Sequence, residues 1–157
     1  MKKIEILMAN WKNDNVLNPY PATDEDILSF QQAHGVGLPD DCVQFFKTAN
    51  GTGDEYDSKL FQFYALNKIT TIIDEYSEWK GVPNYRQISE TLTNVSSYYA
   101  FANYLSHSFA YVIRLLPDYK ERGEVLAVSG GEFKMIAGSI TEFIELYLND
   151  SPKLQLG

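Results

Sequence analysis

The order of two hydrophobic periodicities along the chain is the feature that most constrains its fold. In residues 1–50, apolar side chains recur every three or four residues, as they do on one face of a helix. In residues 98–136 they instead form short aromatic or β-branched runs between turn residues, a pattern typical of strands. Because helices and strands are segregated rather than alternating, the sequence predicts an α+β fold with an antiparallel sheet.

Most of the predicted helices carry, beside their apolar stripe, a signal for where they begin or end. Thr23 is a suitable N-cap for a helix that ends at His34-Gly35, and Pro39 occupies the first position of the next helix, which Asn50-Gly51 ends. Ser139–Glu142 has the composition of a capping box for the last helix. The stripes are Ile4, Leu7, Met8 and Trp11; Ile27, Phe30 and Ala33; Cys42, Phe45, Phe46 and Ala49; Ile69, Ile72, Ile73 and Tyr76, continued by Trp79; and Ile140, Phe143, Ile144 and Tyr147.

The strand-like segments predict two hairpins and one further strand. Residues 98–105 and 109–115 flank one turn, residues 125–128 and 133–136 flank another, and residues 59–66 alternate as a separate strand. Residues 81–97 are polar and predict a long loop that could hold a helical turn. We therefore expect an antiparallel sheet of roughly four to six strands, with N-terminal helices and a C-terminal helix packed against it. No repeat or linker divides the chain, which predicts a single domain over residues 1–157.

The charge of the chain limits the classes of molecule that it is expected to bind. The formal net charge is −8 and the sequence pI is about 4.7. This sign argues against binding to nucleic acid or to an anionic membrane, both of which attract basic surfaces. Residues 24–57 contain eight acidic residues against Lys47 alone, a net charge of −7 in that window. The negative electrostatic potential of this window would attract a basic protein partner, although many proteins carry acidic surfaces only because the charge keeps them soluble.

Composition also indicates a cytoplasmic protein. The single cysteine, Cys42, permits no intramolecular disulfide and agrees with a reducing compartment. No apolar run approaches the roughly 20 residues that span a bilayer. The first residues look briefly like a signal sequence, but Glu5 interrupts their apolar run and no small-residue cleavage site follows.

The chain offers few residues for chemistry. Cys42 with His34 or His107 is the only conceivable thiol–imidazole pair, and Cys42 stands within an apolar helical stripe, where cysteine behaves as a small buried hydrophobe. One cysteine and two isolated histidines do not supply zinc-ligand spacing. We therefore expect no catalytic residue, no metal site, no cofactor and no enzymatic activity.

The best candidates for partner contact are Asp54, Glu55, Tyr56 and Asp57. The other acidic residues of the same window cap or begin helices, whereas these carboxylates have no local structural explanation. The four residues faintly resemble a calcium loop but lack its further ligands. Tyrosine is enriched at protein interfaces, although in strands it also packs sheet cores, and a tyrosine-rich hairpin would equally serve self-association. The tyrosines that do not all fit one buried face are Tyr56, Tyr85, Tyr98, Tyr99, Tyr104 and Tyr119.

Several of these segments, in this order, resemble the SUKH superfamily. The resemblance combines an acidic helix start, a "G-x-x-LP" segment, a short amphipathic helix, "NG", and a closing strand and helix. It departs from the usual pattern at Cys42, Gly138 and Ile140, which are core or cap positions and bear on the subfamily more than on the fold. The matching segments are Thr23–Ile27, Phe30, Gly35–Asp41, Phe45-Phe46, Asn50-Gly51, Tyr111–Ile113 and Met135–Ile144.

The resemblance implies a function. Proteins of this superfamily are mostly immunity proteins of bacterial toxin–antitoxin and polymorphic toxin systems, and many of the paired toxins are nucleases. The resemblance implies that the chain binds a cognate basic toxin and neutralises the toxin by occluding its active site. Two alternatives stay open. One is a general interaction or regulatory module, like the fungal cell-wall synthesis regulator of the superfamily. The other is a small-molecule binder or hydrolase with a Tyr- and His-lined pocket.

Overall fold

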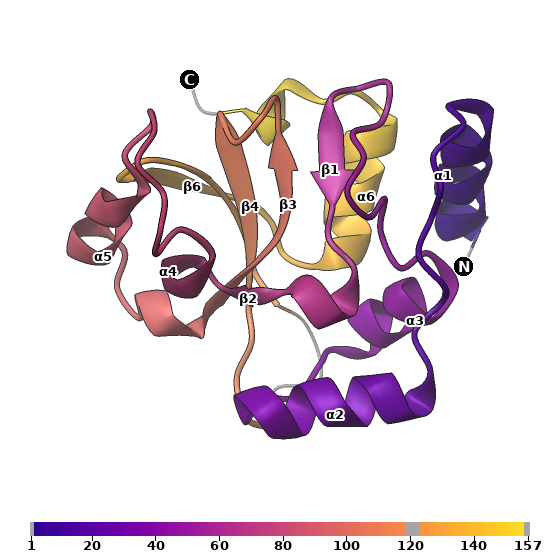
Figure 1. The fold of residues 1–157 in the computed structure, drawn as a ribbon, viewed down its shortest axis with the longest axis horizontal. Helices are drawn as coiled ribbons and strands as arrows, with labels where there is room; N and C mark the ends of the chain where they lie inside the picture. The colour runs from indigo at the N-terminus through magenta and orange to yellow at the C-terminus, as the bar shows by residue number, and fades with distance from the viewer. Residues whose placement is uncertain (1, 119–122, 156–157) are drawn as a thin grey trace.

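The computed structural model describes residues 2–118 and 123–155, and it confirms the predicted α+β fold (Figure 1). Three helices lead, a six-stranded antiparallel sheet occupies the middle and back, and one further α-helix follows it. The α-helices are α1 (Lys2–Asn13), α2 (Asp24–His34), α3 (Asp40–Thr48), α4 (Ile72–Glu75), α5 (Ile88–Thr91) and α6 (Ile140–Leu148). The strands are β1 (Phe61–Phe63), β2 (Thr70–Thr71), β3 (Tyr98–Tyr104), β4 (Phe109–Arg114), β5 (Val125–Ser129) and β6 (Glu132–Ala137). The 3₁₀ turns are η1 (Leu66–Lys68), η2 (Tyr85–Gln87), η3 (Val95–Ser97) and η4 (Pro152–Leu154).

The sheet has the order β1-β3-β4-β5-β6, and β2 also pairs with β3. β1 pairs with the end of β3, where Phe63 faces Ala102, and β2 pairs with its start, where Thr71 faces Tyr99. The two short strands therefore act as one interrupted edge strand, with η1 between them. Both predicted hairpins, β3–β4 and β5–β6, are present as antiparallel pairs.

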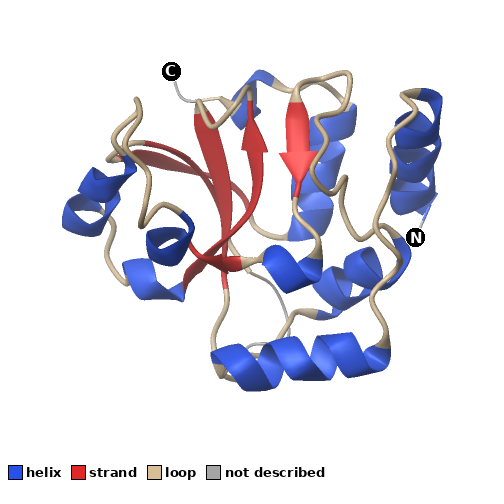
Figure 2. Cartoon of the chain, viewed as in Figure 1, coloured by secondary structure: helices blue, strands red, loops and turns tan. Residues whose placement is uncertain are grey.

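Helices cover both faces of the sheet. Figure 2 shows α6, α3 and α1 on one side, α4 and α5 on the other, and α2 across one end. On the α6 side, Phe143 packs against Phe63, Phe101 and Tyr111, with ring centroids 5.1–6.1 Å apart. Buried apolar side chains from Ile4 to Leu154 form one continuous cluster, so both ends of the described chain contribute to the core.

The helix caps confirm the predicted boundaries, with two differences of detail. Thr23 and Asp26 form a reciprocal capping box, and Gly35 ends α2 in the left-handed conformation with φ 63°. Pro39 is the N-cap of α3 rather than its first helical residue. Ser139 accepts a hydrogen bond from the amide of Glu142, whereas the Glu142 carboxylate accepts one from the amide of Gly138 instead of from Ser139.

Three predictions in the middle of the chain are correct only in part. The strand expected over residues 59–66 spans only β1, because Leu60 adopts a positive φ of 70° and η1 follows soon after. The helix expected over residues 69–76 begins only at Ile72, because Thr70 and Thr71 bond to β3. The loop expected over residues 81–97 is mostly short helical turns. None of the described helices is long and apolar enough to cross a membrane.

Candidate functional site

Two loops lie side by side at one surface of the protein. We call residues 16–22 and 50–56 the paired loops. The side chain of Asn18 donates to the carbonyl of Gly51 (2.7 Å), and that of Asn50 donates to the carbonyl of Tyr20 (2.9 Å). The amide of Leu17 donates to the Glu55 carboxylate (3.1 Å). These bonds give two stretches without regular secondary structure a defined shape.

The paired loops expose apolar and acidic side chains together. Tyr20 is 93% exposed and Leu17 is 80% exposed, on the loop beside the exposed Asp54, Glu55 and Tyr56. Large apolar side chains that are this exposed do not contribute to the core. Exposed aromatic side chains surrounded by polar groups are typical of protein interfaces. Leu17 and Tyr20 were not predicted as contact residues, although two large apolar residues in an Asn- and Pro-rich segment were a visible signal.

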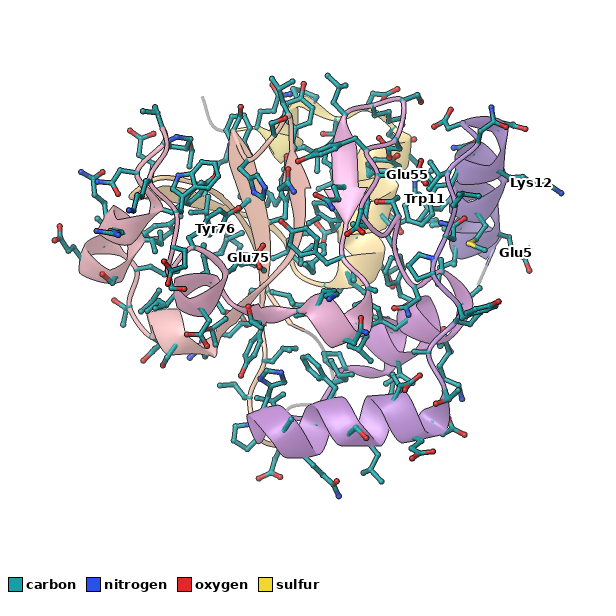
Figure 3. All side chains as sticks on the ribbon, viewed as in Figure 1. Glu5, Trp11, Lys12, Glu55, Glu75 and Tyr76 are labelled. Atoms are coloured by element: carbon teal, nitrogen blue, oxygen red, sulfur yellow. The ribbon has the colours of Figure 1, made fainter. Side chains whose placement is uncertain are left out.

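Asp57 is separated from the other three predicted contact residues. Its side chain is only 4% exposed, so we leave it out of the contact surface. Its carboxylate accepts hydrogen bonds from Trp11 Nε1 (3.1 Å), from the Tyr147 hydroxyl, and from the amides of Lys59 (2.9 Å) and Phe61 (3.0 Å). Figure 3 shows Trp11 directed from α1 toward α6 and β1. A buried carboxylate with this many donors holds elements together and does not meet a partner.

A cleft of about 530 Å³ opens beside the paired loops. Its wall comes from the loop before β1, from β1 and η1, from α4, and from the turn between β3 and β4. Figure 3 shows Glu75 and Tyr76 at the α4 side of the sheet. Asp54 and Pro19 belong to both the cleft and the paired loops, so the two features form one continuous surface. The polar residues that line the cleft are Asp54, Gln62, Tyr64, Asn67, Lys68, Glu75 and His107.

The floor of the cleft is held by one buried amide, Asn103. Its Nδ2 group donates to Gln62 Oε1 (3.0 Å) and to the Tyr64 hydroxyl (2.9 Å). Its Oδ1 atom accepts from the Tyr56 hydroxyl (2.8 Å) and from the amide of His107 (3.0 Å). Because Asn103 is fully buried in β3, these bonds fix the side chains and backbone around it.

His107 is held in an unusual backbone conformation. Leu105, Ser106 and His107 all have positive φ, at 50°, 51° and 69°. The carbonyl of His107 accepts from the Tyr85 hydroxyl (2.6 Å), and its Nδ1 atom shares a hydrogen bond with the Tyr76 hydroxyl (2.9 Å). Left-handed backbone is costly for residues other than glycine, so these contacts stabilise a turn that would otherwise relax.

The electrostatics of the cleft centre on Glu75. Burial raises the pKa of the Glu75 carboxyl, and the neighbouring Tyr64 hydroxyl opposes this shift. Burial also lowers the pKa of His107, which keeps its imidazole neutral at pH 7. Glu75 forms no salt bridge with any residue in the described part of the chain. With the exposed Lys68 as the one cation of its lining, the cleft is acidic when both Asp54 and Glu75 are ionised.

The other predicted tyrosines lie mostly inside the protein. Tyr85, Tyr98 and Tyr99 are buried, Tyr104 is half-buried, and Tyr119 lies outside the described residues. Packing of the sheet and of its α4 side therefore accounts for most of the aromatic runs, and among the described members of this set only Tyr56 is exposed.

The described residues hold little catalytic potential. Cys42 is buried in α3, and burial and the nearby Asp41 carboxylate raise the pKa of its thiol. It therefore stays a protonated thiol, a poor nucleophile. Within residues 2–118 and 123–155, no three His, Cys, Asp or Glu side chains gather closely enough to hold a metal ion.

The family can be assigned from sequence comparison. The sequence model of the SMI1 / KNR4 family (SUKH-1) matches residues 21–146, well over half of the chain. The chain belongs to this family. Comparison with curated proteins finds no match. Membership in the SUKH-1 family supports an immunity-protein-like role in general and a protein as the binding partner, and the family is not known for catalysis.

Proposed function

We propose that this SUKH-1 protein acts in the bacterial cytoplasm, where it binds a basic protein toxin and neutralises it by covering the toxin's active site. A nuclease is the class of toxin that fits best, because its active-site cleft must be positively charged to hold phosphates. Neutralisation in this proposal needs binding only and no chemistry by the immunity protein.

One observation carries the proposal: the loop that exposes Leu17 and Tyr20 is hydrogen-bonded to the loop that exposes Asp54, Glu55 and Tyr56. Aromatic side chains supply most of the affinity at protein interfaces, and rim charges steer the encounter and set its salt dependence. The paired loops offer both, in a shape that internal hydrogen bonds already define. Little ordering is then required on binding, which favours affinity.

The proposal is tested by a pull-down from the native bacterium with the tagged protein as bait, followed by mass spectrometry. We expect recovery of a protein with a basic toxin domain, and loss of that protein when the bait carries Tyr20→Ala. Val82→Ala is the matched control, because Val82 is 94% exposed and lies away from the paired loops, between α4 and η2. Neither substitution removes core packing, so both variants should fold normally.

Other results would favour the alternatives. Recovery of regulatory or housekeeping proteins would indicate an interaction module without a toxin. A partner that binds the Tyr20→Ala bait as strongly as the unmodified bait would exclude the paired loops as the contact surface. A pure toxin, once identified, should lose its activity in proportion to the immunity protein added.

A further inference from the structure

The cleft beside the paired loops contains a carboxylate that the described protein leaves without a counter-ion. We propose that this cleft receives an arginine side chain of the partner protein, with Glu75 as its counter-ion. This inference rests on the proposed function, because it names the chemical group that the partner inserts next to the paired loops. The Glu75–arginine contact would add one specific ion pair to the apolar and acidic contacts that the paired loops offer.

Glu75 lies where it can act as a counter-ion inside the cleft. It projects from α4 into the wall of the cleft, where it is half-buried and without a salt bridge among the described residues. A carboxylate at this depth is poorly solvated, and a cation that enters the cleft stabilises its charged form. The exposed Glu78, three residues further on, is a carboxylate that is not part of the cleft lining.

The cleft has a defined shape before any guest enters it. Asn103 holds Gln62 and Tyr64, and Gln62 Nε2 also donates to the carbonyl of Gly53 (2.9 Å). The backbone of His107 is held by Asn103 and Tyr85. Folding has already ordered the residues that line the cleft. Binding of a guest side chain therefore costs little further conformational entropy.

The groups that line the cleft fit an arginine side chain better than a lysine side chain. A guanidinium group is planar, weakly hydrated and able to donate in several directions, and it stacks on aromatic faces. The lining offers the carboxylates of Asp54 and Glu75, the amide oxygens of Gln62 and Asn67, and the ring of Tyr64. A lysine ammonium group would use fewer of these acceptors and would lose more hydration.

The charge balance around the cleft agrees with a cationic guest. Its titratable lining groups are Asp54, Tyr64, Lys68, Glu75 and His107. The imidazole is neutral at pH 7 and the tyrosine hydroxyl stays protonated, because burial lowers the pKa of His107 and raises that of Tyr64. Lys68 is exposed, so solvent and salt screen its charge more than they screen the half-buried Glu75.

The test uses the full chain, labelled with ¹⁵N, and three small probes followed by NMR. N-acetyl-arginine amide carries the guanidinium group, N-acetyl-citrulline amide is its neutral isostere, and N-acetyl-lysine amide carries an ammonium group. We expect saturable shifts of the Gln62 and Asn67 side-chain amides with the arginine probe. The citrulline probe should give none, and the lysine probe should bind at least about threefold more weakly.

Two variants make the test specific. Glu75→Gln keeps the shape and the acceptor oxygen but removes the charge, and it should abolish the saturable response to the arginine probe. Glu78→Gln makes the same change on an exposed neighbour and should leave the response intact. Equal shifts with the arginine and citrulline probes, or an unchanged response in Glu75→Gln, would overturn the proposal.

The outcome also separates this inference from the proposed function. If the arginine probe fails to bind while Tyr20→Ala still releases the toxin in the pull-down, the cleft inference falls and the proposed function stands. If the arginine probe binds and no toxin is recovered, the cleft retains its ligand class and the proposed function falls. With the partner in hand, Glu75→Gln should weaken its binding about tenfold or more.

Discussion

Trp11 in α1 donates a hydrogen bond through Nε1 to the buried carboxylate of Asp57, at 3.1 Å, across 46 positions of the chain. The same carboxylate accepts from Tyr147 near the end of α6. Trp11 lies outside the segment that matches the family, whereas Asp57 lies within it. One carboxylate thus ties the N-terminal helix α1 to the SUKH-1 core.

We expect Asp57→Asn to lower the free energy of unfolding by about 2–4 kcal/mol, because an amide replaces a carboxylate that serves several buried donors. Trp11→Phe should cost about 1–3 kcal/mol from the lost bond and lost ring volume. Urea denaturation of both single variants and the double variant would give their coupling. We expect it to lie between about 0.5 and 3 kcal/mol, and strict additivity would contradict a direct interaction.

Stability should also depend on the ionisation of Glu75. Because burial raises its pKa, the folded protein binds more protons than the unfolded chain between the two pKa values. The contribution of Glu75 to stability therefore falls as the pH rises through its ordinary pKa of 4.5, and the loss is complete above the folded-state pKa.

Glu75→Gln mimics the protonated acid at every pH. We expect this variant to have a higher thermal unfolding midpoint than the natural protein at pH 7 and no advantage below the ordinary pKa of 4.5. Glu78→Gln is the matched control and should show no comparable gain, because Glu78 is exposed. A gain of equal size in both variants would point to net charge rather than to burial.

The left-handed turn between β3 and β4 gives a prediction about strain. Ser106 is exposed and has a φ of 51°, a region that glycine occupies without steric cost. Ser106→Gly should therefore raise the free energy of unfolding by about 0.5–1 kcal/mol. Ser96→Gly, an exposed serine in η3, should lower it by a similar amount. Chemical denaturation of the two variants would compare them, and a loss with Ser106→Gly would show that the turn is not strained.

Cys42 should prove structural. It is 1% exposed, so Cys42→Ser places a hydroxyl in an apolar site and should cost about 1–3 kcal/mol of stability. Cys42→Ala shows how much of that loss comes from volume alone. Binding of the partner by the folded fraction should be unchanged in both. A Cys42→Ser protein that folds normally and no longer binds would instead indicate chemistry at the thiol.

Much of the architecture could be predicted because it depends on neighbours in sequence. The N-cap at Thr23, the glycine at position 35 after α2 and the stripe of Cys42, Phe45 and Phe46 are all local signals, and each corresponds to an observed helix. The hairpins followed from runs of aromatic and β-branched residues around turns. The helix predicted from Ile69 starts late, at Ile72, because Thr70 and Thr71 pair with β3, a contact that the local sequence does not reveal.

The candidate site was predicted only in part, because burial of a side chain depends on contacts with residues that are distant in sequence. Charge and loop composition pointed to Asp54, Glu55 and Tyr56, which lie on the surface, but they also pointed to Asp57, which hydrogen bonds from distant residues draw into the core.

The sequence by itself determined the fold class, most of the helix boundaries, both hairpins and the acidic charge, since periodicity, caps and ionisable groups act locally or sum along the chain. Only the tertiary structure decided which acids are buried and which are exposed, that the loop of Leu17 and Tyr20 pairs with the loop of Glu55, and that Glu75 and His107 share one cleft. These relationships join residues far apart in sequence through packing and hydrogen bonds that form only when the chain has folded.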